Sequence, residues 1–183
     1  MKKGNKKSNF LKKSLIYLAF FAILLFATVK GTKYYFYDSD LTVKQTDLSE
    51  LTIDGIKLKD IAADVDTSSY NYTDYTEPSC NYNFKELSYR SNAEDQIEYI
   101  VADYKKVNVK FNEEQAEKLS RISDVWKALG SNYTKDTYKP EENNYWRICR
   151  YTDSKHGIYI GIVYSRYNND IAKIIVSTRK IKW

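Results

Sequence analysis

The clearest pattern in the chain is a run of sixteen uncharged, mostly apolar residues near the N-terminus, at positions 14–29. Six lysines precede the run, and the first acidic residue after it is Asp38. A helix over this run is about 24 Å long, slightly short of the ~30 Å hydrocarbon core of a bilayer, and flanking lysines can snorkel at both ends. Because positive charge favours the cytoplasmic side, residues 1–13 predict a cytoplasmic basic tail and residues 14–37 a single-pass transmembrane signal anchor.

An aromatic cluster at positions 34–37 follows the run and matches the belt that retained anchors place at the membrane interface,. Small residues at Ala27, Val29 and Gly31 leave open a signal peptide that is removed instead,. Both alternatives predict that the rest of the chain lies outside the cytoplasm.

Apolar residues alternate with polar ones in two groups of three segments farther along the chain, as they do in half-buried strands. The segments are 84–90, 96–104 and 106–111 in the first group, and 145–152, 156–166 and 171–178 in the second. Connections within each group are too short for a crossover, so each group predicts an antiparallel meander.

Each meander is preceded by a helical pattern. The dipeptide at 54–55, Asp-Gly, can close a tight hairpin, and a short helix is predicted over 59–65,. A longer helix is predicted over 112–129, with Asn112 as N-cap and Gly130 as C-cap. A break near 120–123, with a second short helix after it, is the alternative.

These elements predict an α+β fold. After a tether over residues 38–50, the chain is expected to form two helix-plus-three-stranded antiparallel meander units, at 51–111 and 112–183. The two units share the order of helix, tyrosine-rich loop and three strands, which indicates an internal repeat.

Two short motifs carry a resemblance to a known architecture. They are IKLKD at 56–60 and ISDVWKALG at 122–130, the second similar to a helix that ends in Leu-Gly before a strand. Over residues 51–178 the chain resembles the β-lactamase-inhibitor-protein fold and the small outer-membrane assembly lipoproteins related to it. The resemblance implies a protein-binding scaffold and not an enzyme, and it carries over no specific binding residue.

The distribution of charge along the chain bears on whether the protein binds nucleic acid. The whole chain has a net charge of +5, but residues 1–37 hold 8 lysines and no acid. The rest of the chain therefore holds 21 basic and 24 acidic residues and has a net charge of −3. A nucleic-acid reader would place its basic excess in the folded domain, so a nucleic-acid partner is not expected.

Catalytic motifs are missing from the sequence. The single histidine, His156, lies at a predicted turn, the glycines are isolated, and the cysteines follow no CxxC pattern,. No cofactor, metal or catalytic residue is predicted. Cys80 and Cys149 can form a long-range disulfide outside the cytoplasm or stay as two buried thiols,. Acid pairs at 94–95, 113–114 and 141–142 keep a carboxylate-dependent cell-wall enzyme as the less supported alternative.

Aromatic residues in and after two polar loops, 67–83 and 131–144, are the most distinctive feature. Tyrosine gives a large contact area at low entropy cost, so these residues form a candidate binding surface. Packing of the same rings onto the sheets is the alternative. The candidates are Tyr70, Tyr72, Tyr75, Tyr82, Tyr133, Tyr138, Tyr145 and Trp146.

The sequence thus predicts a membrane-anchored extracytoplasmic protein-binding or accessory module with a protein partner at the cell surface. The abundance of Lys, Asn, Ile and Tyr is typical of an AT-rich Gram-positive bacterium. A secreted inhibitor or immunity-type protein, with its leader removed, is the alternative.

Overall fold

The computed structural model describes residues 45–74, 76–113, 115, 117–138 and 145–180. The basic tail and the predicted anchor, residues 1–37, lie outside the described residues. Within the described part, no helix has the length and apolarity that a membrane crossing requires. The predicted single-pass transmembrane helix therefore has no counterpart in the part of the chain that the structure describes.

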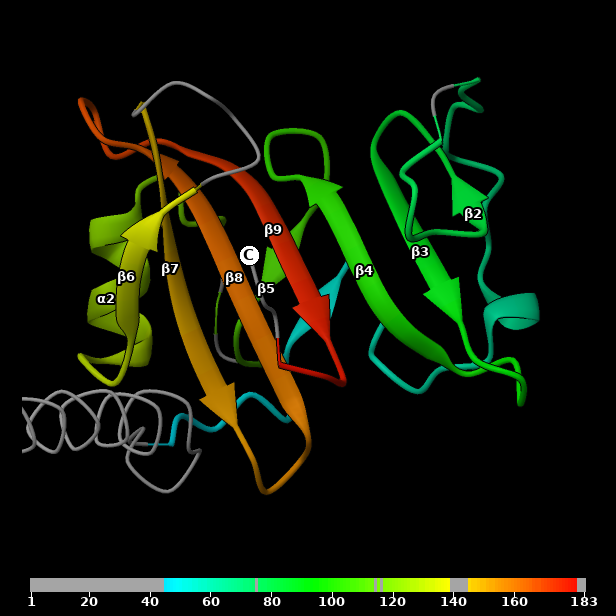
Figure 1. Cartoon of the computed structure of the whole chain (residues 1–183), viewed down its shortest axis with the longest axis horizontal. Coiled ribbons are helices and arrows are strands. Elements are labelled where there is room, and N and C mark those ends of the chain that lie inside the picture. Colours follow the sequence, from blue (N-terminus) through cyan, green and yellow to red (C-terminus); the bar gives the residue numbers. More distant parts are fainter. Residues whose placement is uncertain (1–44, 75, 114, 116, 139–144, 181–183) are drawn as a thin grey trace, which may run out of the picture. The chain divides into compact units, whose positions relative to one another are not determined.

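The main element of the described chain is one antiparallel sheet of seven strands, in the order β2-β3-β4-β9-β8-β7-β6 (Figure 1). The strands are β2 (Tyr82–Asn83), β3 (Leu87–Ser91), β4 (Ile97–Asp103), β6 (Thr134–Thr137), β7 (Trp146–Asp153), β8 (Ile158–Ser165) and β9 (Ile171–Ser177). The isoleucine- and valine-rich strands β8 and β9 lie inside the sheet, where branched side chains pack well on both faces,.

A pairing between β4 and β9 overturns the prediction of two separate helix-plus-meander units. Ile100 lies opposite Val176 and Ala102 opposite Ile174, so strands from both halves of the chain form a single sheet. The second predicted meander is present as β7, β8 and β9, and the first two strands of the first group are present as β3 and β4. No helix-plus-meander repeat is seen in the described residues.

The third strand predicted for the first meander is the reason for this difference. Only β5 (Val109–Lys110) forms there, and it pairs with β1 (Thr52–Ile53) in a separate two-stranded sheet. The edge of β4 that it was expected to use is occupied by β9, whose Ile174 and Val176 are almost fully buried. Burial of these branched side chains favours β9 over a segment that carries lysine and asparagine.

The first predicted helix, over 59–65, is a single 3₁₀ turn, η1 (Ala62–Asp64). Lys59 has a φ of 73°, which interrupts a right-handed helix,. The N–H of Ala62 donates to the carbonyl of Asp95 at 2.8 Å instead of to a helical partner. The predicted hairpin before it is confirmed, because Ile53 and Ile56 exchange two backbone hydrogen bonds across Asp54 and Gly55, both with positive φ,.

The second predicted helix is also shorter than expected. In the described residues α2 (Ile122–Leu129) is the one α-helix, and Gly130 follows it as predicted. The side chain of Gln115 accepts the N–H of Phe111 and donates to the carbonyl of Val109, which holds the chain in a turn. The alternative with a break near 120–123 is therefore nearer to the structure, and the fold is mostly β.

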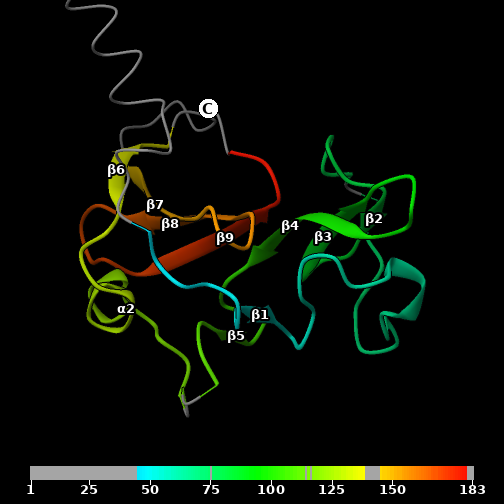
Figure 2. The ribbon, with the colours of Figure 1, turned by 90° about the horizontal axis from the view of Figure 1, so that it is seen from below.

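One face of the sheet is covered by α2 and by the β1–β5 pair, which lie on the same side of it (Figure 2). Ile122 and Val125 of α2 join Cys149, Ile162 and other buried side chains in the larger core cluster. A smaller cluster lies on the other face. Its buried members are Val101, Tyr138, Ile148, Val163 and Ile175.

Candidate binding surface

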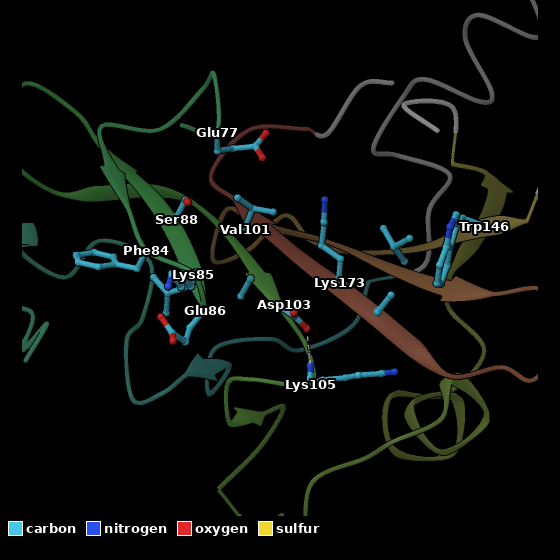
Figure 3. A pocket seen from close by; sticks show the side chains of 14 residues that line it. Glu77, Phe84, Lys85, Glu86, Ser88, Val101, Asp103, Lys105, Trp146 and Lys173 are labelled. Carbon is cyan, nitrogen blue, oxygen red and sulfur yellow. Dashed lines mark hydrogen bonds between the residues drawn. The ribbon is translucent and has the colours of Figure 1, made fainter. Parts of the chain in front are cut away.

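A shallow groove of about 390 Å³ crosses the face of the sheet that carries the smaller cluster (Figure 3). Val101 of β4, Val163 of β8 and Trp146 of β7 line it, and Lys173 of β9 lies between Val101 and Trp146. The charged lining residues that the structure describes are three lysines and three acids. The lysines are Lys85, Lys105 and Lys173, and the acids are Glu77, Glu86 and Asp103.

At one end of β7 and β8 three aromatic side chains gather in what we call the aromatic end: Tyr145, Trp146 and Tyr167. The ring centroids of Tyr145 and Tyr167 are 4.7 Å apart, and those of Tyr145 and Trp146 are 5.6 Å apart. Tyr145 is 45 % exposed and Tyr167 is 72 % exposed. The N–H of Arg166 donates to the carbonyl of Tyr145 at 3.0 Å, which fixes the start of β7 beside the end of β8.

A second pocket, of about 330 Å³, carries a cluster of cations. We call it the basic pocket; its lining residues are Trp126, Lys135, Asp136, Arg147, Tyr164, Arg166 and Asn169. Strand register builds it, because Arg147 of β7 lies opposite Thr137 of β6 on one side and Tyr164 of β8 on the other. The guanidinium of Arg147 also donates a hydrogen bond to the Thr137 hydroxyl.

Aromatic rings form the wall of the basic pocket. The ammonium Nζ of Lys135 lies 3.6 Å from the centre of the Trp126 ring, within cation–π range,. Trp126 also stacks on Tyr133 at 5.3 Å. Burial raises the pKa of Tyr164 to about 12, against the opposing charge of Arg147, so its hydroxyl is neutral at physiological pH and can donate,.

Four of the eight predicted binding residues pack against the protein. Tyr70 contacts Phe84 with ring centroids 5.5 Å apart, and Tyr82 stacks on Tyr89 at 4.6 Å. Tyr133 stacks on Trp126, and Tyr138 is buried in the smaller cluster. For these four rings, the alternative of packing onto the sheet describes the structure.

The other candidates divide by position. Tyr72 is 75 % exposed but lies in the loop that precedes β2, away from the aromatic end in sequence and strand order. Tyr75 lies outside the described residues. Tyr145 and Trp146 lie together, and the sequence reasoning missed their neighbour Tyr167, which follows β8 in the turn to β9. An aromatic residue inside an otherwise polar turn was the available signal.

The two cysteines are free thiols. Cys149 lies in the larger cluster, where Trp126 Nε1 is 3.4 Å from its sulfur, whereas Cys80 packs against the smaller cluster. Burial raises the pKa of Cys80 to about 12 and that of Cys149 to about 11, so neither is a thiolate at neutral pH,. The disulfide alternative is not realised, and the thiols are not activated as nucleophiles.

Three side chains, Asp47, Asp153 and His156, bring potential metal-ligand atoms within 4.8 Å of one another. Asp153 is 2 % exposed, and its carboxylate accepts the N–H of Leu48 at 2.9 Å and the N–H of His156 at 3.1 Å. The His156 ring Nδ1 is 2.7 Å from the same carboxylate. These hydrogen bonds tie the start of the described chain to the β7–β8 turn, so the cluster is a structural clasp.

Electrostatics agree with this interpretation of Asp153. Burial alone would raise the pKa of this carboxyl group, but the hydrogen bonds from Leu48 and His156 outweigh burial and hold the pKa below its ordinary value,. Of the acid pairs, Glu94 and Asp95 lie in the β3–β4 turn, where the Asp95 carboxylate accepts the N–H of Ala63. The other two pairs include residues outside the described part.

No known protein family matches this chain, and neither a curated protein nor a solved structure matches it. The resemblance in architecture over residues 51–178 stays a prediction.

Proposed function

We propose that this chain is a non-catalytic protein-binding module that acts outside the cytoplasm and holds its partner through the aromatic end. The observation that carries the proposal is the group formed by the exposed rings of Tyr145 and Tyr167 and the half-buried ring of Trp146, next to Arg166, whose N–H donates to the Tyr145 carbonyl. Tyrosine, tryptophan and arginine are the residues that most often dominate the binding energy of protein interfaces.

The geometry of this group suits binding at low cost. Tyr145 and Tyr167 are already in contact before any partner arrives, and the Arg166 N–H bond fixes the backbone beneath them. Side chains that are ordered in the free protein lose less entropy on association. Trp146 also lines the groove of Figure 3, so a partner seated on the aromatic end can extend across the sheet.

Photo-crosslinking tests the proposal. A benzoylphenylalanine placed at Tyr167 of the full-length chain in cells is expected to give one discrete protein adduct after irradiation. The same probe at Tyr72 is the matched control, because that ring is equally exposed but lies in the other tyrosine-rich loop. Adding Tyr145→Ala is expected to reduce the adduct at position 167 by about ten-fold. Equal adducts at positions 167 and 72, or no adduct at 167, would contradict the proposal.

A further inference from the structure

Among the residues that the structure describes, the basic pocket has an excess of positive charge. Lys135, Arg147 and Arg166 line it, and the one acid among its described lining residues is Asp136, whose carboxylate lies 3.7 Å from the guanidinium of Arg150. Arg166 makes no side-chain ion pair or hydrogen bond with another described residue. This concentration of cations contrasts with residues 38–183 as a whole, which carry a net negative charge.

Hydrogen-bond donors in the pocket come from side chains and not from the backbone. In the β8–β9 turn, the N–H groups of Tyr167 and Asn168 donate to the Ser165 hydroxyl, and that of Asn169 donates to the Ser165 carbonyl. The N–H of Asp170 donates to the Asn168 side chain. Phosphate sites commonly recruit free backbone N–H groups, whereas a carboxylate is well matched by the fork of one guanidinium.

The pocket also has an apolar wall. Trp126 is half-buried with its ring under Lys135, and Tyr164 is buried with a neutral hydroxyl. The two methylene groups of a glutamate can pack against such rings while its carboxylate meets the cations. At about 330 Å³ the pocket is larger than one side chain, so it has room for more than one residue of a peptide segment.

We infer that the basic pocket binds the glutamate side chains of an acidic segment in the partner protein. The inference rests on the proposed protein-binding function and adds the chemistry of the partner. Arg147 and Arg166 bind the carboxylates, and Trp126 contacts the methylene groups. The pocket and the aromatic end share the start of β7 and the end of β8, because the N–H of Arg166 donates to the carbonyl of Tyr145. Side chains alternate along a strand, so Arg147 lies on the face that α2 covers and Trp146 lies on the opposite face,.

The first test measures binding of a fluorescein-labelled nonapeptide with four glutamates and one phenylalanine to the full-length chain by anisotropy. A peptide with glutamine at the four positions is the matched probe, and we expect it to bind about ten-fold more weakly. Binding of the glutamate peptide is expected to weaken as salt rises. Equal affinity for the two peptides would overturn the inference.

Variants locate the site. Arg166→Gln is expected to weaken binding of the glutamate peptide several-fold. The variant should still fold, because the Arg166 side chain has no partner among the described residues,. Arg166→Gln combined with Arg147→Gln should weaken it further, with near-ultraviolet circular dichroism as the folding check. The matched control is Arg179→Gln, whose side chain is 79 % exposed at the far end of β9. Equal losses in Arg166→Gln and Arg179→Gln would assign the binding to non-specific charge.

Two outcomes separate this inference from the proposed function. If inorganic phosphate displaces the peptide and the glutamate and glutamine peptides bind alike, the pocket is a phosphate site and the inference fails. If the Tyr167 adduct persists unchanged in Arg147→Gln/Arg166→Gln, the protein-binding function stands and the acidic-segment inference fails. Loss of the adduct in that variant, together with loss of peptide binding, supports both.

Discussion

Two groups of tyrosines in this molecule have opposite surroundings. Near β2, Tyr70 donates a hydrogen bond from its hydroxyl to Asp54 at 3.3 Å and borders a pocket with one lysine, Lys59. That pocket is lined by four acids: Asp54, Asp60, Asp64 and Asp66. At the other end of the sheet, Tyr145 and Tyr167 contact each other, and the carbonyl of Tyr145 accepts the N–H of Arg166, which lines the basic pocket.

Packing differs between the two groups as well. The ring of Tyr70 contacts Phe84, and the ring of Tyr82 stacks on Tyr89. These rings therefore contribute to the core. Tyr145 and Tyr167 mainly contact each other and leave much of their surface in water. A high tyrosine content therefore does not identify a binding surface; exposure and neighbouring charge distinguish a recognition ring from a core ring.

Removing a core ring of the first group should have the largest effect. Tyr89 is 1 % exposed and contacts Tyr82 and Phe84, so Tyr89→Ala is expected to lower the free energy of unfolding by about 3–5 kcal/mol,. Urea denaturation of the full-length chain measures this loss.

The matched change in the second group is Tyr167→Ala, which should alter the free energy of unfolding by less than about 0.5 kcal/mol. It should nevertheless weaken partner binding. A similar loss of stability for both variants would mean that the two groups do not differ in role.

A second contrast concerns one carboxylate in each half of the molecule. Asp153 is buried and binds the N–H groups of Leu48 and His156, whereas Asp54 is exposed and binds the N–H of Asn108 at 2.6 Å. Asp153→Asn is expected to lower the free energy of unfolding by about 2 kcal/mol, because a charged acceptor of buried hydrogen bonds is lost. Asp54→Asn should cost under about 1 kcal/mol, since asparagine tolerates the positive φ,.

The pH dependence of unfolding gives a second test of Asp153. Because the folded pKa of Asp153 is lowered, its stabilisation is present above the ordinary aspartate pKa of about 3.9 and is lost as pH falls through the folded pKa,. Asp153→Asn should therefore flatten the fall in stability below about pH 4. If the free energy of unfolding of Asp153→Asn falls below about pH 4 as steeply as that of the unchanged chain, Asp153 is not the source of this pH dependence.

Local strand patterns were readable from the sequence, and long-range pairings were not. Alternating residues and short connections predicted β7, β8 and β9 and their meander,. The β4–β9 pair joins residues 70 to 78 positions apart, and no connection length between them restricts the choice. Two similar groups of strands therefore predict a repeat, whereas the structure joins them in one sheet.

The helices were over-predicted for a related reason. Apolar spacing continued upstream of Ile122, but it does not reveal that the Gln115 side chain binds two backbone groups and holds a turn,. Likewise, nothing in the residues around Lys59 signals its positive φ. Whether a side chain hydrogen-bonds to the backbone and ends a helix depends on tertiary structure. A hydrophobic period of 3.6 residues does not predict it.

For the candidate site, the sequence pointed to Tyr145 and Trp146 but not to the charges beside them. Lys135, Arg147 and Arg166 come from β6, β7 and the turn after β8, and only strand register brings them together. The net charge of −3 is a sum over residues 38–183, so it does not show this local excess of positive charge.

A small effect is expected at Lys135, whose ammonium lies over aromatic rings at the wall of the basic pocket. Its Nζ lies 3.6 Å from the Trp126 ring and 5.0 Å from the Tyr133 ring, so Lys135→Gln is expected to lower the free energy of unfolding by about 0.5–1 kcal/mol,. The control is Lys127→Gln, which removes an exposed lysine that pairs with Asp124 at 3.3 Å and should cost less than about 0.5 kcal/mol,. If the two variants are equally stable, the ring does not hold the Lys135 ammonium. That ammonium would then be free to meet a ligand carboxylate, and Lys135→Gln should weaken the glutamate peptide as strongly as Arg166→Gln does.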